Sequence, residues 1–151
     1  IIDRLLTHRR YNDDYRPILF KVSPDITKEQ LDEIIDLILI SGIDGIVATN
    51  TTRSREGLKT DKERIDFIGE GGLSGAPLYK KSLEMVKYIH KKTEGNLPII
   101  AVGGISTPEQ AYEMLEAGAS LIQIYTGFIY NGPATVKKML KYIVKQSKSK
   151  C

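Results

Sequence analysis

Four short apolar runs, rich in β-branched residues, alternate along the chain with four amphipathic helical patterns. The runs are hydrophobic almost throughout, which is typical of strands in a parallel sheet that is covered by helices. Repeated βα units place successive parallel strands together through right-handed crossovers, so the pattern predicts an α/β fold. The predicted strands are Pro17–Val22, Asp44–Thr49, Pro98–Val102 and Ser120–Tyr125.

Two of the predicted helices begin with a capping box, in which a threonine is followed three residues later by a glutamine. The boxes begin at Thr27 and Thr107, and the second has a proline at the first helical position. Gly42 and Gly118 stand where each helix is expected to end in a left-handed cap. These signals predict where both helices start and stop.

The remaining helical segments have weaker boundaries. A third helix is predicted from about Leu78 to Lys92, and residues Ile1–Arg10 are predicted to be the last turns of a preceding helix. Arg53–Gly72 is too long for a simple βα loop and favours a lid or a ligand clamp. The last helix is predicted from an apolar stripe formed by Val136, Met139, Leu140 and Ile143.

The length suggests about half of a closed barrel. The chain has 151 residues, whereas a complete (β/α)8 barrel needs ~250, so about four βα units are expected. Because residue 1 is Ile rather than Met, we expect the sequence to be truncated or processed. An open four-stranded sheet has two bare edges, which favours pairing with a missing half or self-association through these edges. A flavodoxin-like sheet is the alternative architecture.

Composition is that of an ordinary globular domain, with 41% hydrophobic and 27% charged residues. The net charge of +3 comes from the segment Lys137–Lys150, which holds six lysines and no acidic residue. We interpret this segment as the solvated end of a helix and expect no nucleic-acid partner. No run approaches the roughly 18 apolar residues of a membrane span, and no leader pattern opens the chain. The single cysteine, Cys151, excludes an intrachain disulfide.

Polar or glycine-containing motifs follow the strands where the apolar runs stop. The carboxyl ends of parallel barrel strands meet on one face, which carries the chemistry in such folds. The motifs are FKVSPD with Lys21, VATNTT with Thr49–Thr52, AVGGI with Gly103–Gly104, and QIYTG with Tyr125–Gly127. We therefore expect them to contribute to one site.

Each motif suits a particular contact. Gly103–Gly104 together with Thr126 favours a phosphate site over a simple tight turn. Lys21 is expected to be largely desolvated and could be a Schiff-base nucleophile, a phosphate contact, a cation beside a cofactor, or an ammonium group reaching the rim; Asp25 is a candidate salt-bridge partner. The Asn50 amide, flanked by hydroxyls, suits a planar heterocycle. His8 and His90 fall on predicted helices, and no metal-ligand spacing is present.

The motifs KVSPD, TNTT, GGLSGAPL, VGGI and QIYTGFIYNGP, in this order and spacing, resemble dihydroorotate dehydrogenases of the quinone-dependent class 2. The resemblance implies a TIM barrel that oxidises (S)-dihydroorotate to orotate in pyrimidine (UMP) biosynthesis, with FMN as hydride acceptor and a quinone as final acceptor. It implies that Lys21 contacts the flavin ring, that Asn50 and Thr51 bind the pyrimidine, and that the other FMN contacts are Thr49, Gly75, Gly104, Tyr125 and Thr126.

The same resemblance places the serine base and the helical quinone domain in an N-terminal half. Residues 1–151 would then be the C-terminal half of the barrel, without a catalytic residue, and we expect no turnover of dihydroorotate by this chain alone. It also implies peripheral attachment to the cytoplasmic side of the inner membrane, or to the mitochondrial inner membrane in a eukaryote. The alternatives are another FMN barrel oxidoreductase acting on a pyrimidine, and a non-catalytic half-barrel that binds FMN or another phosphate ligand.

Overall fold

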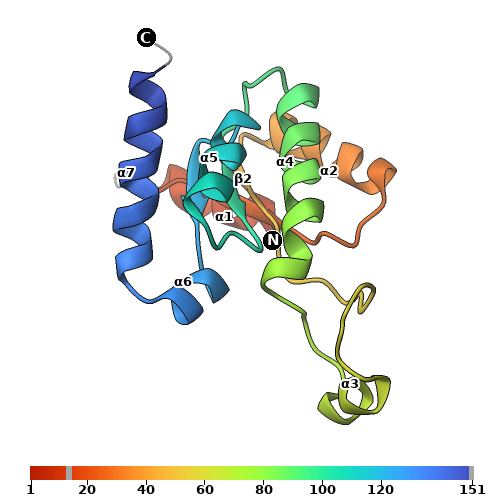
Figure 1. Ribbon diagram of the computed structural model, residues 1–151. Helices are drawn as coiled ribbons and strands as arrows, with labels where there is room; N and C mark the ends of the chain where they lie inside the picture. Colours follow the sequence, from red (N-terminus) through yellow and green to blue (C-terminus); the bar gives the residue numbers. More distant parts are fainter. Residues whose placement is uncertain (13–14, 150–151) are drawn as a thin grey trace.

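One parallel sheet contains all four predicted strands, and its strand order follows the chain in the computed structural model, which describes residues 1–12 and 15–149 (Figure 1). A flavodoxin-like sheet has the order 2-1-3-4-5, so the sequential order shows that this alternative is wrong. Lys150 and Cys151 lie outside the described residues. The strands are β1 (Leu19–Val22), β2 (Gly45–Ala48), β3 (Ile99–Val102) and β4 (Leu121–Gln123).

The strands are shorter than predicted, most clearly at the last one. We expected β4 to reach Tyr125, but it ends at Gln123 and Tyr125 is already the N-cap of the next helix. The helices that follow or connect the strands are α1 (Ile2–Arg10), α2 (Lys28–Ser41), α3 (Lys62–Ile68), α4 (Tyr79–Lys92), α5 (Pro108–Glu116), α6 (Thr126–Asn131) and α7 (Ala134–Lys148), with a 3-10 turn η1 (Ala76–Leu78) before α4.

The predicted helix signals are confirmed in detail. Thr27 and Thr107 each accept a hydrogen bond from the amide of the glutamine three residues later, whose side chain accepts from the threonine amide in return. Gly42 ends α2 in the left-handed conformation, with φ +77° and ψ +28°. At the end of α5 the cap is Ala117, one residue before the predicted position, and Gly118 follows it with φ +104°.

The helices bury one face of the sheet. Ile46 and Ile99 on the two central strands have no exposed surface, and Ile35 of α2 and Val86 of α4 are equally buried in the same apolar cluster. Alternate residues of a strand point to opposite faces, so the neighbours of Ile46 and Ile99 form a second face. On this second face Leu19 is 37% and Leu121 61% exposed. We expected strands buried on both faces, and that expectation is wrong for the outer strands, because none of the residues that the structure describes covers Leu19 or Leu121 fully.

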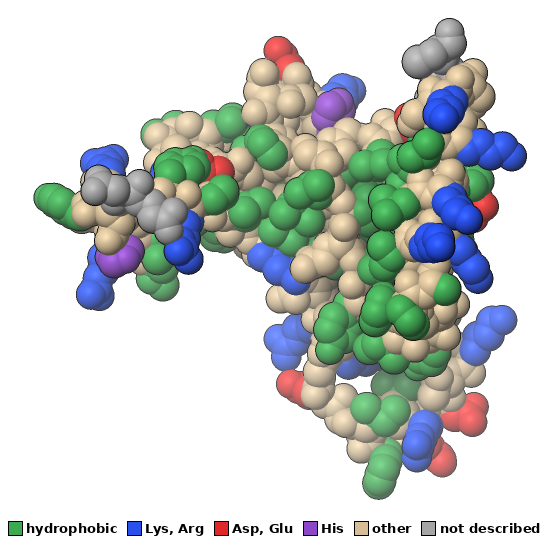
Figure 2. Space-filling view, turned by 90° about the vertical axis from the view of Figure 1, so that its left-hand side faces the viewer, with side chains coloured by type: hydrophobic (Ala, Val, Ile, Leu, Met, Phe, Trp, Pro, Cys, Tyr) green, Lys and Arg blue, Asp and Glu red, His purple; other side chains and the backbone are tan. Residues whose placement is uncertain are grey.

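Helix α7 is present, but its predicted apolar stripe is partly wrong. Met139 is buried and Ile143 packs against the core, whereas Val136 and Leu140 are exposed. The helix turns Thr135 and Met139 inward, so the apolar positions next to them point away from this core. Hydrophobic side chains are exposed over the middle of the side of the molecule that carries α7 (Figure 2).

The long connection after β2 closes on itself. Thr52 and Leu73 form an isolated antiparallel bridge at its base, and α3 lies in the part that extends away from the sheet (Figure 1).

At the opposite end of the sheet, Asp44 accepts hydrogen bonds from Arg9, Tyr15 and the Ile18 amide. Within the described residues, no helix has the length and apolar character needed to cross a membrane.

Candidate functional site

A pocket of about 160 Å³ lies at the carboxyl ends of the four strands. It contains every residue for which the sequence predicts a cofactor or substrate contact, so the structure brings together motifs that are more than 100 positions apart in the chain. These residues are Lys21, Thr49, Asn50, Thr51, Gly75, Gly104, Tyr125 and Thr126. Parallel strands that share a direction place their ends along one rim, which is why the motifs converge.

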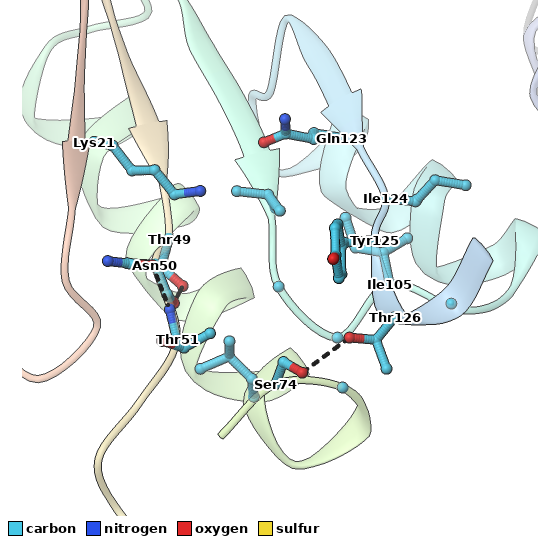
Figure 3. A pocket seen from close by; sticks show the side chains of 16 residues that line it. Lys21, Thr49, Asn50, Thr51, Ser74, Ile105, Gln123, Ile124, Tyr125 and Thr126 are labelled. Atoms are coloured by element: carbon cyan, nitrogen blue, oxygen red, sulfur yellow. Dashed lines mark hydrogen bonds between the residues drawn. The ribbon is translucent and has the colours of Figure 1, made fainter. Parts of the chain in front are cut away.

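Both the strands and the loops after them contribute side chains to the lining of the pocket (Figure 3). Lys21 projects from β1, and Thr49–Thr51 form the loop that leaves β2. The Asn50 carbonyl oxygen of the side chain accepts a 3.0 Å hydrogen bond from the Thr51 amide, which holds that side chain close to the loop. Gln123 projects from β4 into the same space. One rim of the sheet therefore offers an ammonium group, two amides and several hydroxyls.

Glycines form the part of the pocket where backbones approach most closely. Gly104 has φ +73°, and a Cβ at this position would lie 2.5 Å from the Tyr79 backbone nitrogen and 2.8 Å from the Gly75 carbonyl oxygen. Gly75 has φ +85° and packs against the Thr126 side chain. Gly104 requires glycine for both conformation and space, and Gly75 requires it for conformation; both leave peptide groups uncovered for a ligand.

A hydroxyl contact joins the two loops that surround the glycines. The Thr126 hydroxyl donates a 3.0 Å hydrogen bond to the Ser74 oxygen, and Figure 3 shows this contact across the lower edge of the pocket. The loop before α4 and the start of α6 are thereby held side by side. The arrangement leaves an oxygen-rich and glycine-rich corner suited to hydrogen bonding with an anionic oxygen.

Lys21 differs from the expectation in two respects. It is exposed rather than largely desolvated, because the strand face from which it projects is uncovered in this chain. Its proposed partner Asp25 is bound elsewhere: Asp25 accepts from the Lys81 ammonium at 2.8 Å, the Thr52 hydroxyl at 2.6 Å and the Arg53 amide at 2.7 Å. The Lys21 side chain therefore projects into the pocket without pairing with Asp25.

The Asp25 contacts also set the acidity of this carboxyl group. Burial acts to raise the pKa of Asp25, but the hydrogen bonds from Lys81, Thr52 and Arg53 outweigh it and lower the pKa to about 2. The charged form therefore ties the loop after β1 to the loop after β2 and to α4 at neutral pH. This places the Asn50–Thr51 segment beside Lys21 without any direct contact between Asp25 and Lys21.

The charge pattern of the pocket favours an anionic ligand. Among the described lining residues, Lys21 is the only charged side chain, and the others are apolar, hydroxyl, amide or glycine. His8 lies on α1 and His90 on α4, both outside the pocket, as the sequence predicts. No group of three or more potential metal-binding side chains occurs among the residues that the structure describes.

Sequence reasoning missed several lining residues. Gln123 follows from strand alternation, since it shares the uncovered face with Leu121 on the short strand β4. Ser74 lies in the GGLSGAPL motif, where a contact is predicted for Gly75 alone, and Leu78 belongs to the turn before α4. The predicted lid, residues 53–72, contributes none of the lining residues.

The size of the pocket indicates one wall of a larger site. Sites that enclose a small-molecule ligand usually have volumes of about 300 to 1,000 Å³, well above the 160 Å³ found here. The uncovered strand face continues directly from the pocket, since Lys21 and Gln123 belong to both. The geometry can hold one side of a flat, anionic ligand and leaves the other side open.

Comparison with known proteins identifies a single family. A family model described as dihydroorotate dehydrogenase matches residues 2–146. The curated dihydroorotate dehydrogenase (quinone) of Christiangramia forsetii is 48% identical over 147 residues, which are 95% of this chain and 42% of that protein. The protein of the same name from Nocardia farcinica is 50% identical over 123 residues, 82% of this chain and 33% of its own length. The chain thus spans less than half the length of these relatives.

Solved structures agree with the sequence relatives. The crystal structure of dihydroorotate dehydrogenase from Eimeria tenella in complex with ferulenol has a TM-score of 0.81 and 35% identity, covering 91% of this chain and 36% of that one. The ligand-free form from the same organism has a TM-score of 0.77 and 38% identity, over 84% and 34% of the two chains. These enzymes are (β/α)8 barrels, and this chain has the fold of part of such a barrel with four βα units.

Proposed function

The chain belongs to the dihydroorotate dehydrogenase family, and from this premise we propose that it provides the FMN-binding wall of a quinone-dependent enzyme. The reaction proposed for the whole protein is oxidation of (S)-dihydroorotate to orotate in pyrimidine biosynthesis, with a quinone as final acceptor. Residues 1–151 would form the C-terminal half of the barrel, in keeping with the 42% of the relative's length that they match.

One observation carries the proposal: seven residues from four strand ends share a pocket with Gly75 of the loop before α4, and Lys21 is the charged side chain among the described lining residues. FMN fits this donor set, because a doubly charged phosphate needs exposed peptide groups and hydroxyls, and an isoalloxazine ring needs flat contacts and hydrogen-bonding groups. Gly104 and Gly75 would lie against the cofactor; a Cβ at Gly104 would collide with the neighbouring backbone, and one at Gly75 would be a tight contact with the Thr126 side chain.

Each residue has a proposed task that follows from its chemistry. Lys21 places a cation beside the ring, where it favours the anionic reduced flavin. Thr49 and Gly75 would contact the cofactor, while Asn50 and Thr51 would bind the pyrimidine through their amide and hydroxyl groups. Tyr125, Thr126 and Gly104 would surround the phosphate region. When bound, the cofactor accepts the hydride, and these side chains bind and orient the reactants.

No proton-abstracting residue is assigned to this chain. We propose that the base and the quinone contacts belong to the remainder of the barrel, so the chain binds FMN but does not oxidise dihydroorotate alone. Peripheral attachment to the inner membrane is likewise proposed for the longer protein, through segments other than those described here.

Titration of FMN against the chain, followed by quenching of flavin fluorescence, tests the proposal. Lys21→Ala and Gly104→Val are expected to weaken binding at least tenfold, since the first removes the charged side chain among the described lining residues and the second fills the space beside Gly104. Lys141→Ala on the exposed face of α7 and Gly42→Val at a helix end with no atom near its Cβ are the matched controls, and both should bind FMN like the parent chain. Binding that depends on neither pocket residue would show that the site is wrongly assigned.

Riboflavin in place of FMN isolates the phosphate contacts. We expect riboflavin to bind at least tenfold more weakly than FMN, because it lacks the group that the glycine-rich corner would hold. Equal affinity would contradict the phosphate assignment while leaving the contact at Lys21 intact. Addition of dihydroorotate under anaerobic conditions should leave the flavin of this chain oxidised, and bleaching of its absorbance would disprove the absence of turnover.

A further inference from the structure

Ser82 is a fully buried polar residue directly behind the pocket, although it does not line it. It lies in the first turns of α4, has no exposed surface, and its oxygen is 3.0 Å from the Thr49 hydroxyl oxygen. A buried hydroxyl without a hydrogen bond costs about 1 to 3 kcal/mol in proteins. Ser82 has no exposed surface, and the Thr49 hydroxyl is the hydrogen-bond partner that the structure shows for its oxygen.

The direction of this hydrogen bond follows from a count of hydrogens. The Thr49 hydroxyl donates to the Asn50 carbonyl oxygen at 2.9 Å, and a threonine hydroxyl has only one hydrogen to give. Ser82 is therefore the donor and Thr49 the acceptor in the pair. The result is a chain of two hydrogen bonds, from Ser82 to Thr49 and from Thr49 to Asn50, which runs from α4 to the loop after β2.

The same serine also contacts the Gly103–Gly104 loop that follows β3. A Cβ placed on Gly103 would lie 2.3 Å from the Ser82 oxygen, so the Gly103 backbone packs directly on this side chain. One turn earlier, the Tyr79 backbone occupies the space beside Gly104. The first turns of α4 thus contact both the Thr49–Asn50 loop and the Gly103–Gly104 loop, which come from neighbouring strands.

From these contacts we propose that Ser82 is a positioning residue: it orients the Thr49 hydroxyl and the Asn50 backbone while it sets the distance of the Gly103–Gly104 loop. That the ligand of this pocket is FMN rests on the proposed function, whereas the contacts of Ser82 with Thr49 and Gly103 do not. A helix that packed through apolar groups alone would bury the same surface without directing either loop. The Ser82 hydroxyl therefore links the Thr49–Asn50 loop, which would contact the flavin ring and the pyrimidine, to the Gly103–Gly104 loop, which would contact the phosphate.

The first test needs no flavin. In Ser82→Ala we expect amide hydrogen exchange at Asn50 and Thr51 to increase at least fivefold over the parent chain. The matched control is Thr93→Val, which removes a buried hydroxyl just past the C-terminal end of α4, where it donates to the Ile89 carbonyl oxygen at 2.9 Å. Thr93→Val should leave exchange at Asn50 and Thr51 unchanged. Equal exchange in both variants would overturn the proposal.

The second test is a double-mutant cycle on FMN affinity. Ser82→Ala and Thr49→Val should each weaken binding about fivefold to tenfold, a typical effect of one hydrogen bond, and the double variant should be no weaker than either. Thr93→Val, which removes a buried hydroxyl outside the pocket, is the control and should bind FMN like the parent. Additive losses would contradict a shared role. If the parent chain binds no FMN, the proposed function fails, and hydrogen exchange alone still decides the role of Ser82.

Discussion

The two faces of the sheet differ sharply although the same four strands form both. On the helix side Ile46 and Ile99 are completely buried, while on the other side Leu19 and Leu121 remain 37% and 61% exposed. Helices of this chain cover the first face, whereas no helix among the described residues covers the outer strands on the second face. The pocket lies at the rim of the uncovered face, which explains both its small volume and the exposure of Lys21.

The largest expected effect compares one residue from each face. Ile46→Ala should lower the free energy of unfolding by about 2 to 5 kcal/mol, because it leaves a cavity in a closely packed layer. Leu121→Ala should change it by less than about 0.5 kcal/mol, since little surface is buried there. Urea denaturation followed by circular dichroism measures both. Equal losses would break the comparison and show that the second face is covered in solution.

A second comparison concerns two glycines with nearly the same φ. Gly42→Ala should cost about 1 kcal/mol from backbone strain alone, because a Cβ there meets no atom within 4 Å. Gly104→Ala should cost about 2 to 4 kcal/mol, since the added methyl also collides with Tyr79 and Gly75 at the pocket rim. Thermal unfolding of both variants tests this difference. Similar losses would mean that the loops around Gly104 can separate without cost.

Acid should loosen the rim before it affects the apolar face. The pKa of Asp25 is about 2 in the folded chain, below its ordinary value of 3.8, so its contribution is complete above about pH 4 and is lost as the pH falls through 2. We expect this contribution to be about 1 kcal/mol after allowance for solvent screening. Urea midpoints measured between pH 5 and 2 should therefore fall less steeply for Asp25→Asn than for the parent.

Lys81→Met sharpens the acid experiment. It removes one of three donors to Asp25 and leaves the Thr52 hydroxyl and the Arg53 amide, so its pH dependence should lie between those of the parent and Asp25→Asn. Identical pH profiles in all three proteins would show that Asp25 does not hold the two loops together.

The smallest effect is expected on the outer side of α7. Leu140→Gln should change the free energy of unfolding by less than about 0.5 kcal/mol, since the leucine is 58% exposed. A loss above about 1 kcal/mol would mean that Leu140 is buried against another surface, such as a second copy of the chain. Sedimentation velocity at two protein concentrations would then detect that self-association.

Much of the fold could be predicted because its signals are local. The capping boxes at Thr27 and Thr107 and the left-handed Gly42 depend on a few neighbouring residues, and all were placed correctly. The α7 stripe failed for the opposite reason. Val136 and Met139 are both apolar and fall near the same helical face, and only the packing of α7 against α5 decides which of them is buried.

The candidate site likewise has features that the sequence predicts and features that only the structure shows. The residue types at the strand ends predict which side chains enter the pocket, because every parallel strand delivers its carboxyl end to the same rim. Asp25 shows the limit of this reasoning: Lys21 is its neighbour in sequence, yet Lys81 on α4 is its partner in space. Ser82 had no sequence signal, since a serine on a helix resembles any surface residue until the helix is docked.

By itself the sequence determined the alternation of strands and helices, the family, and the set of residues that meet at one end of the sheet. These features follow from local backbone preferences, hydrophobic periodicity and the constant direction of parallel strands. The tertiary structure alone decided which apolar faces are covered, which charges pair, and how α4 supports Thr49 and the Gly103–Gly104 loop. Such contacts depend on the distances between elements far apart in the chain, and no local pattern of residues encodes those distances.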